Sequence, residues 1–267
     1  MEATESTTMD KKISENLIEV RGLTRKLGNL KIIRGLDLDV RRGEILVIIG
    51  KSGEGKSVLL KHLAGLLDPD KGSIKIKGRE IVGLSERELN PIRRQVGMMF
   101  QDGALFDSMT VSENVGFPLE EERCHSPEEI DSQVKEMLTL VGMESHSGKM
   151  PINLSGGMRK RVALARAIIT HPDVILYDEP TAGLDPIGAG SIDRLIQETG
   201  EKFGITSVVV THDLNTVRII ADRVAVLRKG RITFEGNPNE LKNSDKPFLR
   251  AFIEGRDEES GTADMSN

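Results

Sequence analysis

The sequence of 267 residues contains no tryptophan, one tyrosine and one cysteine, Cys124. A single cysteine excludes an internal disulfide, and because no signal peptide is evident at the start, the sequence predicts a cytosolic protein. No apolar run approaches the ~20 residues that a membrane-spanning helix needs, so work at a membrane would require a partner that spans it. The formal net charge is -5, which provides no general basic field. We therefore expect no nucleic-acid partner.

The feature that the sequence does contain is a glycine-rich loop between an apolar run, residues 45–49, and a helix-forming run, residues 58–63. The loop fits G-x-x-x-x-G-K-[ST], the pattern of a phosphate-binding P-loop. Its residues, with the one that follows, are Gly50, Lys51, Ser52, Gly53, Glu54, Gly55, Lys56, Ser57 and Val58. Backbone N–H groups at the glycines and the positive end of the next helix both favour a polyphosphate. Lys56 is expected to reach the β- and γ-phosphates and Ser57 to hold Mg²⁺, whereas a chance glycine loop is disfavoured by the strand-and-helix setting.

The rest of the chain alternates strands and helices, which is typical of an α/β fold with a largely parallel sheet covered on both faces. Alternating apolar residues predict strands at 17–23, 36–40 and 73–78, a β-rich lobe around the P-loop. The pattern of residues 102–168 predicts three helices, which would form a helical insertion between strands of the nucleotide-binding core. After residue 173 the alternation resumes, with strands or helices expected at 174–177, 187–203, 206–210, 214–221, 224–227 and 232–234.

The polar ends bound the expected domain. Residues 1–15 cannot bury enough apolar surface to fold alone, so we expect a disordered lead-in. One nucleotide-binding domain is expected over residues 16–244, with the helical subdomain at about 102–168. Residues 245–267 are expected to form a partly disordered extension.

Two acids, Asp178 and Glu179, follow the apolar strand at 174–177. Such a strand brings its terminal charges to the carboxyl edge of a parallel sheet, where ligands bind. Asp178 is predicted to lie behind Mg²⁺, and Glu179 to orient or deprotonate the attacking water. A helix cap is the alternative, but the P-loop in the same chain favours the catalytic interpretation.

A second glycine motif, Leu154-Ser155-Gly156-Gly157, precedes a helix and provides a hydroxyl and backbone N–H groups for an anion. A simple cap would explain Ser155 but not two consecutive glycines. Three further motifs are Gln101, residues 183–186 (Gly-Leu-Asp-Pro) and residues 211–213 (Thr-His-Asp). With the P-loop, the second glycine motif and the two acids, they form one ordered series along the chain. This series resembles an ATP-binding cassette (ABC) ATPase, whose fold has a RecA-like core, an antiparallel β lobe and a helical subdomain.

The resemblance implies a head-to-tail homodimer that binds and hydrolyses ATP. Lys56 and Ser57 of one subunit, with Ser155, Gly156 and Gly157 of the other, would enclose one ATP. The resemblance also implies single-residue roles: Gln101 contacts Mg²⁺ or the water and reports to a membrane partner, Asp185 links the two sites, and His212 holds the γ-phosphate and the water near Glu179.

One position departs from the family pattern. ABC ATPases usually stack an aromatic residue on adenine in the loop after the first strand, and this sequence offers Leu27 there. Stacking contributes ~1–3 kcal/mol per base, whereas leucine provides apolar contact alone. The sequence therefore predicts loose recognition of the base.

Residues 100–119 and 247–255 are similar to the ATPase subunits of the Mla (maintenance of lipid asymmetry) and related Mce-associated phospholipid transporters. That resemblance implies a membrane permease, an Mce-domain lipid-binding protein and, as a further candidate, a STAS-domain regulator. It also implies a peripheral location on the cytoplasmic face of the inner membrane, with glycerophospholipid moved between inner and outer membranes. Ala104, Leu105 and Phe106 could receive a coupling helix of the permease or pack inside the helical lobe, and the sequence leaves both open.

Rival interpretations keep the same ATPase chemistry. Another importer or exporter, or a soluble ABC ATPase of iron–sulfur assembly, would carry the same motifs. A DNA-repair ATPase would need a long coiled coil, and residues 58–153 contain no sustained heptads.

Overall fold

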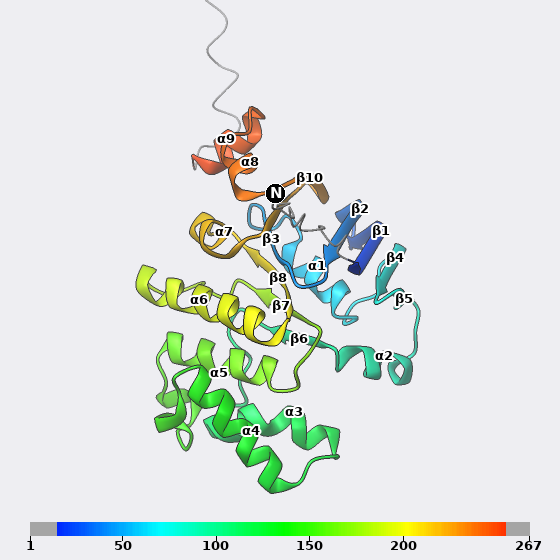
Figure 1. Cartoon of the computed structure of the whole chain (residues 1–267). Helices are drawn as coiled ribbons and strands as arrows, with labels where there is room; N and C mark the ends of the chain where they lie inside the picture. Colours follow the sequence, from blue (N-terminus) through cyan, green and yellow to red (C-terminus); the bar gives the residue numbers. More distant parts are fainter. Residues whose placement is uncertain (1–14, 255–267) are drawn as a thin grey trace, which may run out of the picture.

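A six-stranded sheet runs through the centre of the computed structural model, which describes residues 15–254 (Figure 1). Its strand order is β10-β9-β3-β8-β7-β6, and only the β9–β10 pair is antiparallel. Every residue of β3, β7 and β8 is buried, and β3 and the first four residues of β7 are continuous apolar runs, whereas β8 has three buried valines flanked by serine and threonine. The strands are β3 (Ile45–Ile49), β6 (Val96–Met99), β7 (Val174–Asp178), β8 (Thr206–Thr211), β9 (Arg223–Arg228) and β10 (Arg231–Gly236).

Successive side chains of β3 enter different cores, because neighbouring residues of a strand point to opposite faces. Val47 and Ile49 pack in one cluster with α5, α6 and α7. Leu46 and Ile48 pack in the other, with α1 and the second sheet. The expectation of a sheet covered on both faces is confirmed. The helices are α1 (Lys56–Leu63), α5 (Gly156–Ile168), α6 (Pro186–Phe203) and α7 (Leu214–Ile220).

The second sheet is wholly antiparallel and has the order β2-β1-β4-β5, which confirms the expected antiparallel lobe. Its first two strands extend well beyond the alternating segments that the sequence predicts. The reason is a set of register shifts, one of them between Val20 and Leu23, which interrupt the period of two. The strands are β1 (Asn16–Leu27), β2 (Leu30–Arg41), β4 (Lys71–Ile76) and β5 (Arg79–Glu80).

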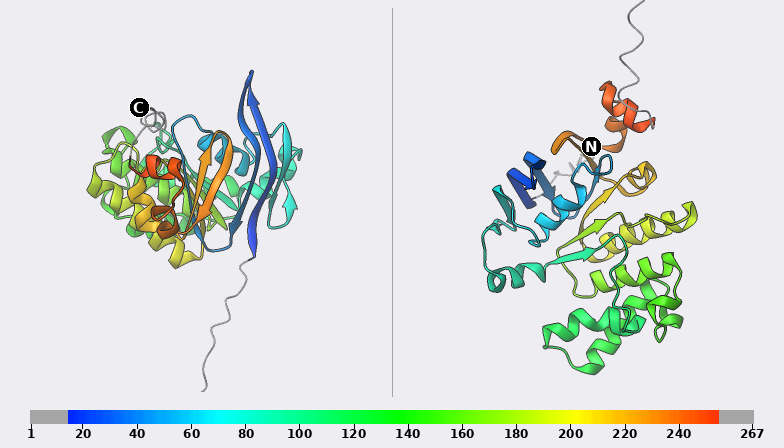
Figure 2. Two further views of the ribbon diagram at one scale, coloured as in Figure 1. Left: turned by 90° about the horizontal axis from the view of Figure 1, so that it is seen from above. Right: turned by 180° about the vertical axis from the view of Figure 1, so that it is seen from behind.

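Helices α3 (Val111–Glu122) and α4 (Pro127–Leu140) lie between β6 and β7 in the chain, and with α5 they form the helical end of the molecule (Figure 2). Thr110 and Ser126 begin α3 and α4 with capping boxes that satisfy the first backbone N–H groups. Two short 3₁₀ turns, Glu144–His146 and Pro151–Asn153, lead from α4 to α5. The domain boundaries expected at residues 16, 102, 168 and 244 stay predictions.

Three helices are absent from the sequence-based expectations: α2 (Glu86–Arg93), α8 (Pro238–Lys242) and α9 (Pro247–Ile253). Capping boxes at Ser85 and Asn237 begin the first two, so a local signal was present. The disordered lead-in was expected at residues 1–15 and the partly disordered extension at 245–267; residues 1–14 and 255–267 of these lie outside the described residues, and α9 lies in the described part of the extension. Between residues 15 and 254, no helix combines the length and apolar character needed to cross a bilayer.

Candidate functional site

The P-loop connects the carboxyl end of β3 to α1, as the sequence predicts. Gly53 and Gly55 have φ values of 81° and 101°, which disfavour residues with a side chain. A Cβ atom at Gly50 would lie 2.4 Å from the carbonyl oxygen of Leu227, and one at Gly55 would lie 2.8 Å from Ile32 Cγ2. These glycines therefore allow both the loop conformation and its close packing.

Lys56 and Ser57, the first residues of α1, direct their polar atoms to the same edge of the sheet. Lys56 is buried, and its Nζ donates to the carbonyl oxygens of Gly50 (2.8 Å) and Lys51 (3.3 Å). Ser57 Oγ donates to Asp178 Oδ1 at 2.8 Å. Burial raises the pKa of Asp178, and the hydrogen bond from Ser57 lowers it in part. A hydroxyl and a carboxylate are the oxygen donors that Mg²⁺ prefers, so this pair could hold that ion.

Glu179 lies between the side chains of Lys56 and His212, just after β7. Its side chain is 13% exposed, with Oε1 3.6 Å from Lys56 Nζ and Oε2 2.9 Å from His212 Nδ1. Oε2 also accepts from Thr211 Oγ1 at 3.2 Å. The backbone N–H of Glu179 donates to Val210 at 2.9 Å, so the ends of β7 and β8 both fix its position. The structure thus brings together three polar groups that the sequence places far apart.

Gln101 follows β6 and is exposed. Its carboxamide makes no hydrogen bond with any other residue in 15–254, and only its carbonyl oxygen accepts one, from Lys160. Contact between Gln101 and a metal or water therefore stays a prediction.

The second glycine motif lies at the start of α5. Ser155 caps this helix by accepting from the backbone N–H of Met158 at 3.3 Å. A Cβ on Gly156 would lie 3.5 Å from the side chain of Leu184, so the motif adjoins residues 183–186. Asp185 caps α6 by accepting from Gly188 N at 2.8 Å. Within the described chain no hydrogen bond joins Ser155, Gly156 or Gly157 to the P-loop, and the two glycine motifs remain separate surfaces.

The remaining predicted nucleotide residues surround the P-loop. Leu27 is 48% exposed and pairs with Leu30 at the end of the β1–β2 hairpin, so it presents apolar surface to solvent. Lys51 and Ser52 are exposed, and Val58 packs against the core. The Glu54 carboxylate accepts from the backbone N–H of Lys229. Glu54 therefore anchors the loop to the β9–β10 turn.

A groove of about 760 Å³ lies between β6, α3 and α5. Phe106 lines it, is 42% exposed, and has its ring centroid 4.8 Å from that of Phe117 and 5.7 Å from the guanidinium carbon of Arg166. Leu105 packs instead against the core, whereas Ala104 is exposed and lines the groove. Leu105 therefore packs inside the molecule, as one of the two interpretations expects, whereas reception of a coupling helix by Ala104 and Phe106 stays a prediction.

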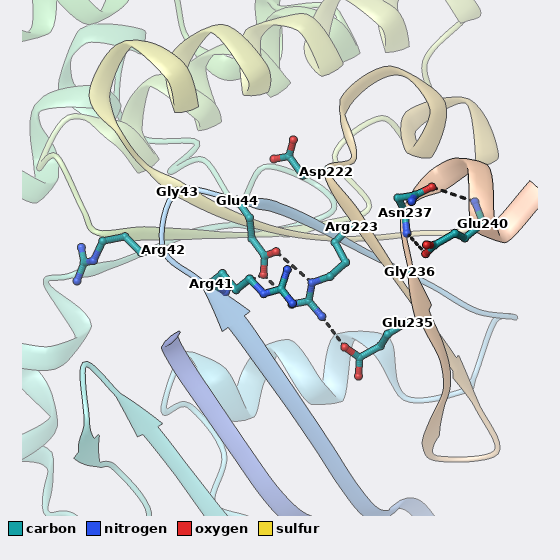
Figure 3. Close-up of a pocket in the computed structure, with 10 residues that line it drawn as sticks. All are labelled: Arg41, Arg42, Gly43, Glu44, Asp222, Arg223, Glu235, Gly236, Asn237 and Glu240. Carbon is teal, nitrogen blue, oxygen red and sulfur yellow. Dashed lines mark hydrogen bonds and ion pairs between the residues drawn. The ribbon is translucent and has the colours of Figure 1, made fainter. Parts of the chain in front are cut away.

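A polar pocket of about 640 Å³ lies beyond the opposite edge of the six-stranded sheet, before β3 rather than after it (Figure 3). At its centre Arg223 donates to Glu44 from Nε (3.0 Å) and Nη2 (2.7 Å), and it pairs with Glu235. Both side chains of the Arg223–Glu44 pair are about nine-tenths buried. Because each charge already has a partner, this cluster joins β9, β10 and the β2–β3 turn rather than forming a second reactive site.

Comparison with known proteins gives one family. Residues 33–182 match the family model for the ABC transporter. The chain is 42% identical over 244 residues to the intermembrane phospholipid transport system ATP-binding protein MlaF of Haemophilus influenzae, covering 91% of this chain and 92% of that protein. It is 43% identical over 239 residues to the probable ribonucleotide transport ATP-binding protein mkl of Mycobacterium leprae, covering 90% and 69%. Among solved structures, the dimeric post-hydrolysis state of the ATP-binding cassette MJ0796 bound to ADP and Pi is similar with a TM-score of 0.77 and 33% identity, covering 83% and 98%.

Proposed function

The chain belongs to the ABC transporter family, and from this premise we propose that it powers phospholipid transport between the inner and outer membranes as the ATPase of a Mla/Mce-type transporter. Nucleotide binding and ATP hydrolysis follow from the family. The observation that supports the phospholipid cargo is the similarity to MlaF, which extends over about nine-tenths of both chains. The alternative is another transport cargo, because the similar protein mkl is named for ribonucleotide transport.

The proposed chemistry assigns one task to each polar group of the site. Lys56 binds the phosphates, and Ser57 with Asp178 holds Mg²⁺, which when bound would neutralise phosphate charge. Glu179 orients the attacking water and accepts its proton. His212 donates to Glu179 and holds it in place (2.9 Å). Lys56 and His212 thus hold the Glu179 carboxylate where the attacking water would meet it.

The site needs a second copy of the chain to be complete. Ser155 is exposed and Gly156 and Gly157 are partly exposed, and together they form a helix start that a nucleotide bound to another P-loop would contact. We assign these residues to the nucleotide of the partner subunit in a head-to-tail homodimer, with Asp185 near the same interface. The similar MJ0796 cassette was solved as a dimer. ATP would then hold the two subunits together, and its hydrolysis would release them.

The remaining partners follow from the same proposal. A permease would insert a coupling helix into the groove that Phe106 lines, because this groove is partly apolar and joins β6 to the helical subdomain. An Mce-domain protein would receive the lipid beyond the membrane, with a STAS-domain subunit as a further candidate. The chain itself would lie on the cytoplasmic face of the inner membrane.

The Phe106→Asp variant tests this groove. We expect its ATPase activity without the permease to remain within about twofold of the native value, while recovery of the complex and transport fall at least ~10-fold, because a buried carboxylate would replace an apolar anchor. Complex recovery is measured by affinity purification and transport by lipid transfer. Ile219→Asp is the control, since Ile219 is 43% exposed but lies on α7, away from the groove. Normal recovery of the complex by Phe106→Asp would remove the groove from the proposal.

The cargo is tested by purifying the tagged chain from its native cell in mild detergent and identifying proteins and lipids by mass spectrometry. We expect a permease, an Mce-domain protein and glycerophospholipid to co-purify. Soluble partners alone would support an ATPase of the iron–sulfur assembly type. A permease without an Mce-domain protein or lipid would support another importer or exporter.

A further inference from the structure

Lys160 is a buried lysine in the first turns of α5, with 6% of its surface exposed. Its Nζ donates to the carbonyl oxygen of Gln101 and, at 3.2 Å, to that of Glu179. These acceptors lie 59 and 19 positions away in the sequence. One ammonium group therefore joins three segments: the helix α5 that Ser155 caps, the segment that follows β6 and the residue after β7.

Burying the ammonium group of Lys160 costs free energy, which its hydrogen-bond partners must offset. Burial lowers the pKa of Lys160, and the charges of Asp102, Asp178 and Glu179 raise it in part. Buried charges persist where hydrogen bonds compensate for lost hydration. Here the two acceptors are backbone carbonyls of the residues proposed to handle the attacking water. The hydrogen bonds that offset the burial of Lys160 are therefore made with the two segments proposed to act in catalysis.

The backbone of Glu179 is itself in an uncommon conformation. Its φ is 46°, in the left-handed region, which costs ~1–2 kcal/mol for a residue with a side chain. Three hydrogen bonds hold the peptide groups on either side: the N–H donates to Val210, and the carbonyl accepts from Lys160 and from the backbone N–H of Ala182. This conformation directs the carboxylate toward Lys56 and His212. Loss of the Lys160 bond would remove one of these three constraints, the one that ties Glu179 to α5.

We propose that Lys160 is a positioning residue for ATP hydrolysis, which holds the backbone of Glu179 so that its carboxylate meets the attacking water. The helix that carries Lys160 begins at Ser155, where the partner subunit's nucleotide is proposed to bind, so Lys160 also connects that nucleotide to the Glu179 of its own subunit. This inference rests on the proposed roles of Glu179 and Ser155. The alternative is that Lys160 simply pins α5 to the sheet.

The first experiment replaces Lys160 with methionine, which keeps the length of the side chain and removes its donors. We expect kcat to fall about 10- to 100-fold, because charged hydrogen bonds to the Glu179 segment are lost. KM for ATP and the binding of a fluorescent ATP analogue are expected to change less than about threefold, because Lys160 contacts no P-loop residue. Lys160→Arg, which keeps the donors, is expected to restore most of kcat. If Lys160→Met fails to fold, Lys160→Leu, which also lacks donors, replaces it with the same expected loss.

Arg161→Met is the matched control. Arg161 lies on the same helix, and it donates to Val141 (2.7 Å) and Ser191 (2.6 Å) without contacting either catalytic segment. A merely structural role for cations on α5 predicts that both variants lower the melting temperature and kcat alike. The positioning role predicts that only Lys160→Met lowers the kcat of the folded protein.

A double-mutant cycle with Glu179→Gln separates the two proposals. If Lys160 acts through Glu179, adding Lys160→Met to Glu179→Gln should change the residual single-turnover rate by less than about threefold. A multiplied loss in the double variant would overturn the positioning role. Normal kcat in Lys160→Met alone would overturn it too, while leaving Glu179 untouched. Normal turnover in Glu179→Gln would instead refute the proposed function on which this inference rests.

Discussion

Glu179→Gln is expected to reduce ATP turnover by ~10²-fold or more while ATP binding persists. The substitution keeps the shape of the side chain and its hydrogen bonds to Thr211 and His212, but an amide cannot accept a proton from water. It also removes the negative charge 3.6 Å from Lys56 Nζ. ATP binding is therefore expected to be as tight as in the native chain or tighter, and the ATP-bound homodimer to accumulate.

Phosphate release measures the loss of turnover, and gel filtration with ATP measures the dimer. Glu198→Gln is the control, because Glu198 is an exposed carboxylate on α6 outside the site. Its turnover should equal that of the native chain. Should Glu179→Gln retain more than about half of native turnover, another base must act, and the proposed role of Glu179 would be abandoned.

Much of the fold was predictable because its signals are local. The buried strands read as apolar runs, and the P-loop joins one of them to a helix at a spacing that few other structures share. The lengths of β1 and β2 were harder to predict from the sequence. Their register shifts interrupt the alternation on which the prediction depends, and only pairing between strands reveals how far they extend. Helix α2 was missed although Ser85 and Glu88 form a capping box, so a local rule was overlooked there.

The site residues also fall into those that local motifs predict and those that only the fold reveals. Lys56, Glu179 and His212 belong to local motifs, and the structure shows that they lie together. Lys160 and Arg223 belong to no such motif. Lys160 bonds carbonyl groups, which every residue possesses, and Arg223 meets a glutamate 179 positions away. A contact of this kind leaves no spacing in the sequence, because the fold alone creates it. Its importance must be found by measuring the effect of its removal.

Arg223→Met is accordingly expected to be the most destabilising substitution outside the nucleotide site. Methionine fills similar volume but leaves Glu44 buried with only the hydrogen bond from the backbone N–H of Arg41, and Glu235 without its ion pair. Removing one partner of a buried pair costs ~3–5 kcal/mol, because the other charge stays desolvated. Burial already raises the pKa of Glu235, and Arg223 counteracts this in part. Without Arg223 the folded chain should bind protons more readily than the unfolded chain, so the variant should lose less stability at pH 5 than at pH 8.

Thermal and urea unfolding measure this loss, which corresponds to a fall in melting temperature on the order of 10 °C. Arg21→Met is the matched control: its ion pair with Asp39 is short (2.6 Å), but the two side chains are 49% and 37% exposed. Exposed pairs contribute ~0–1 kcal/mol, so this variant should unfold close to the native temperature. Adding Glu44→Gln and Glu235→Gln to Arg223→Met should recover part of the loss, because no buried charge is then unpaired. If Arg223→Met and Arg21→Met unfold alike, the cluster in Figure 3 does not contribute to stability as its burial implies.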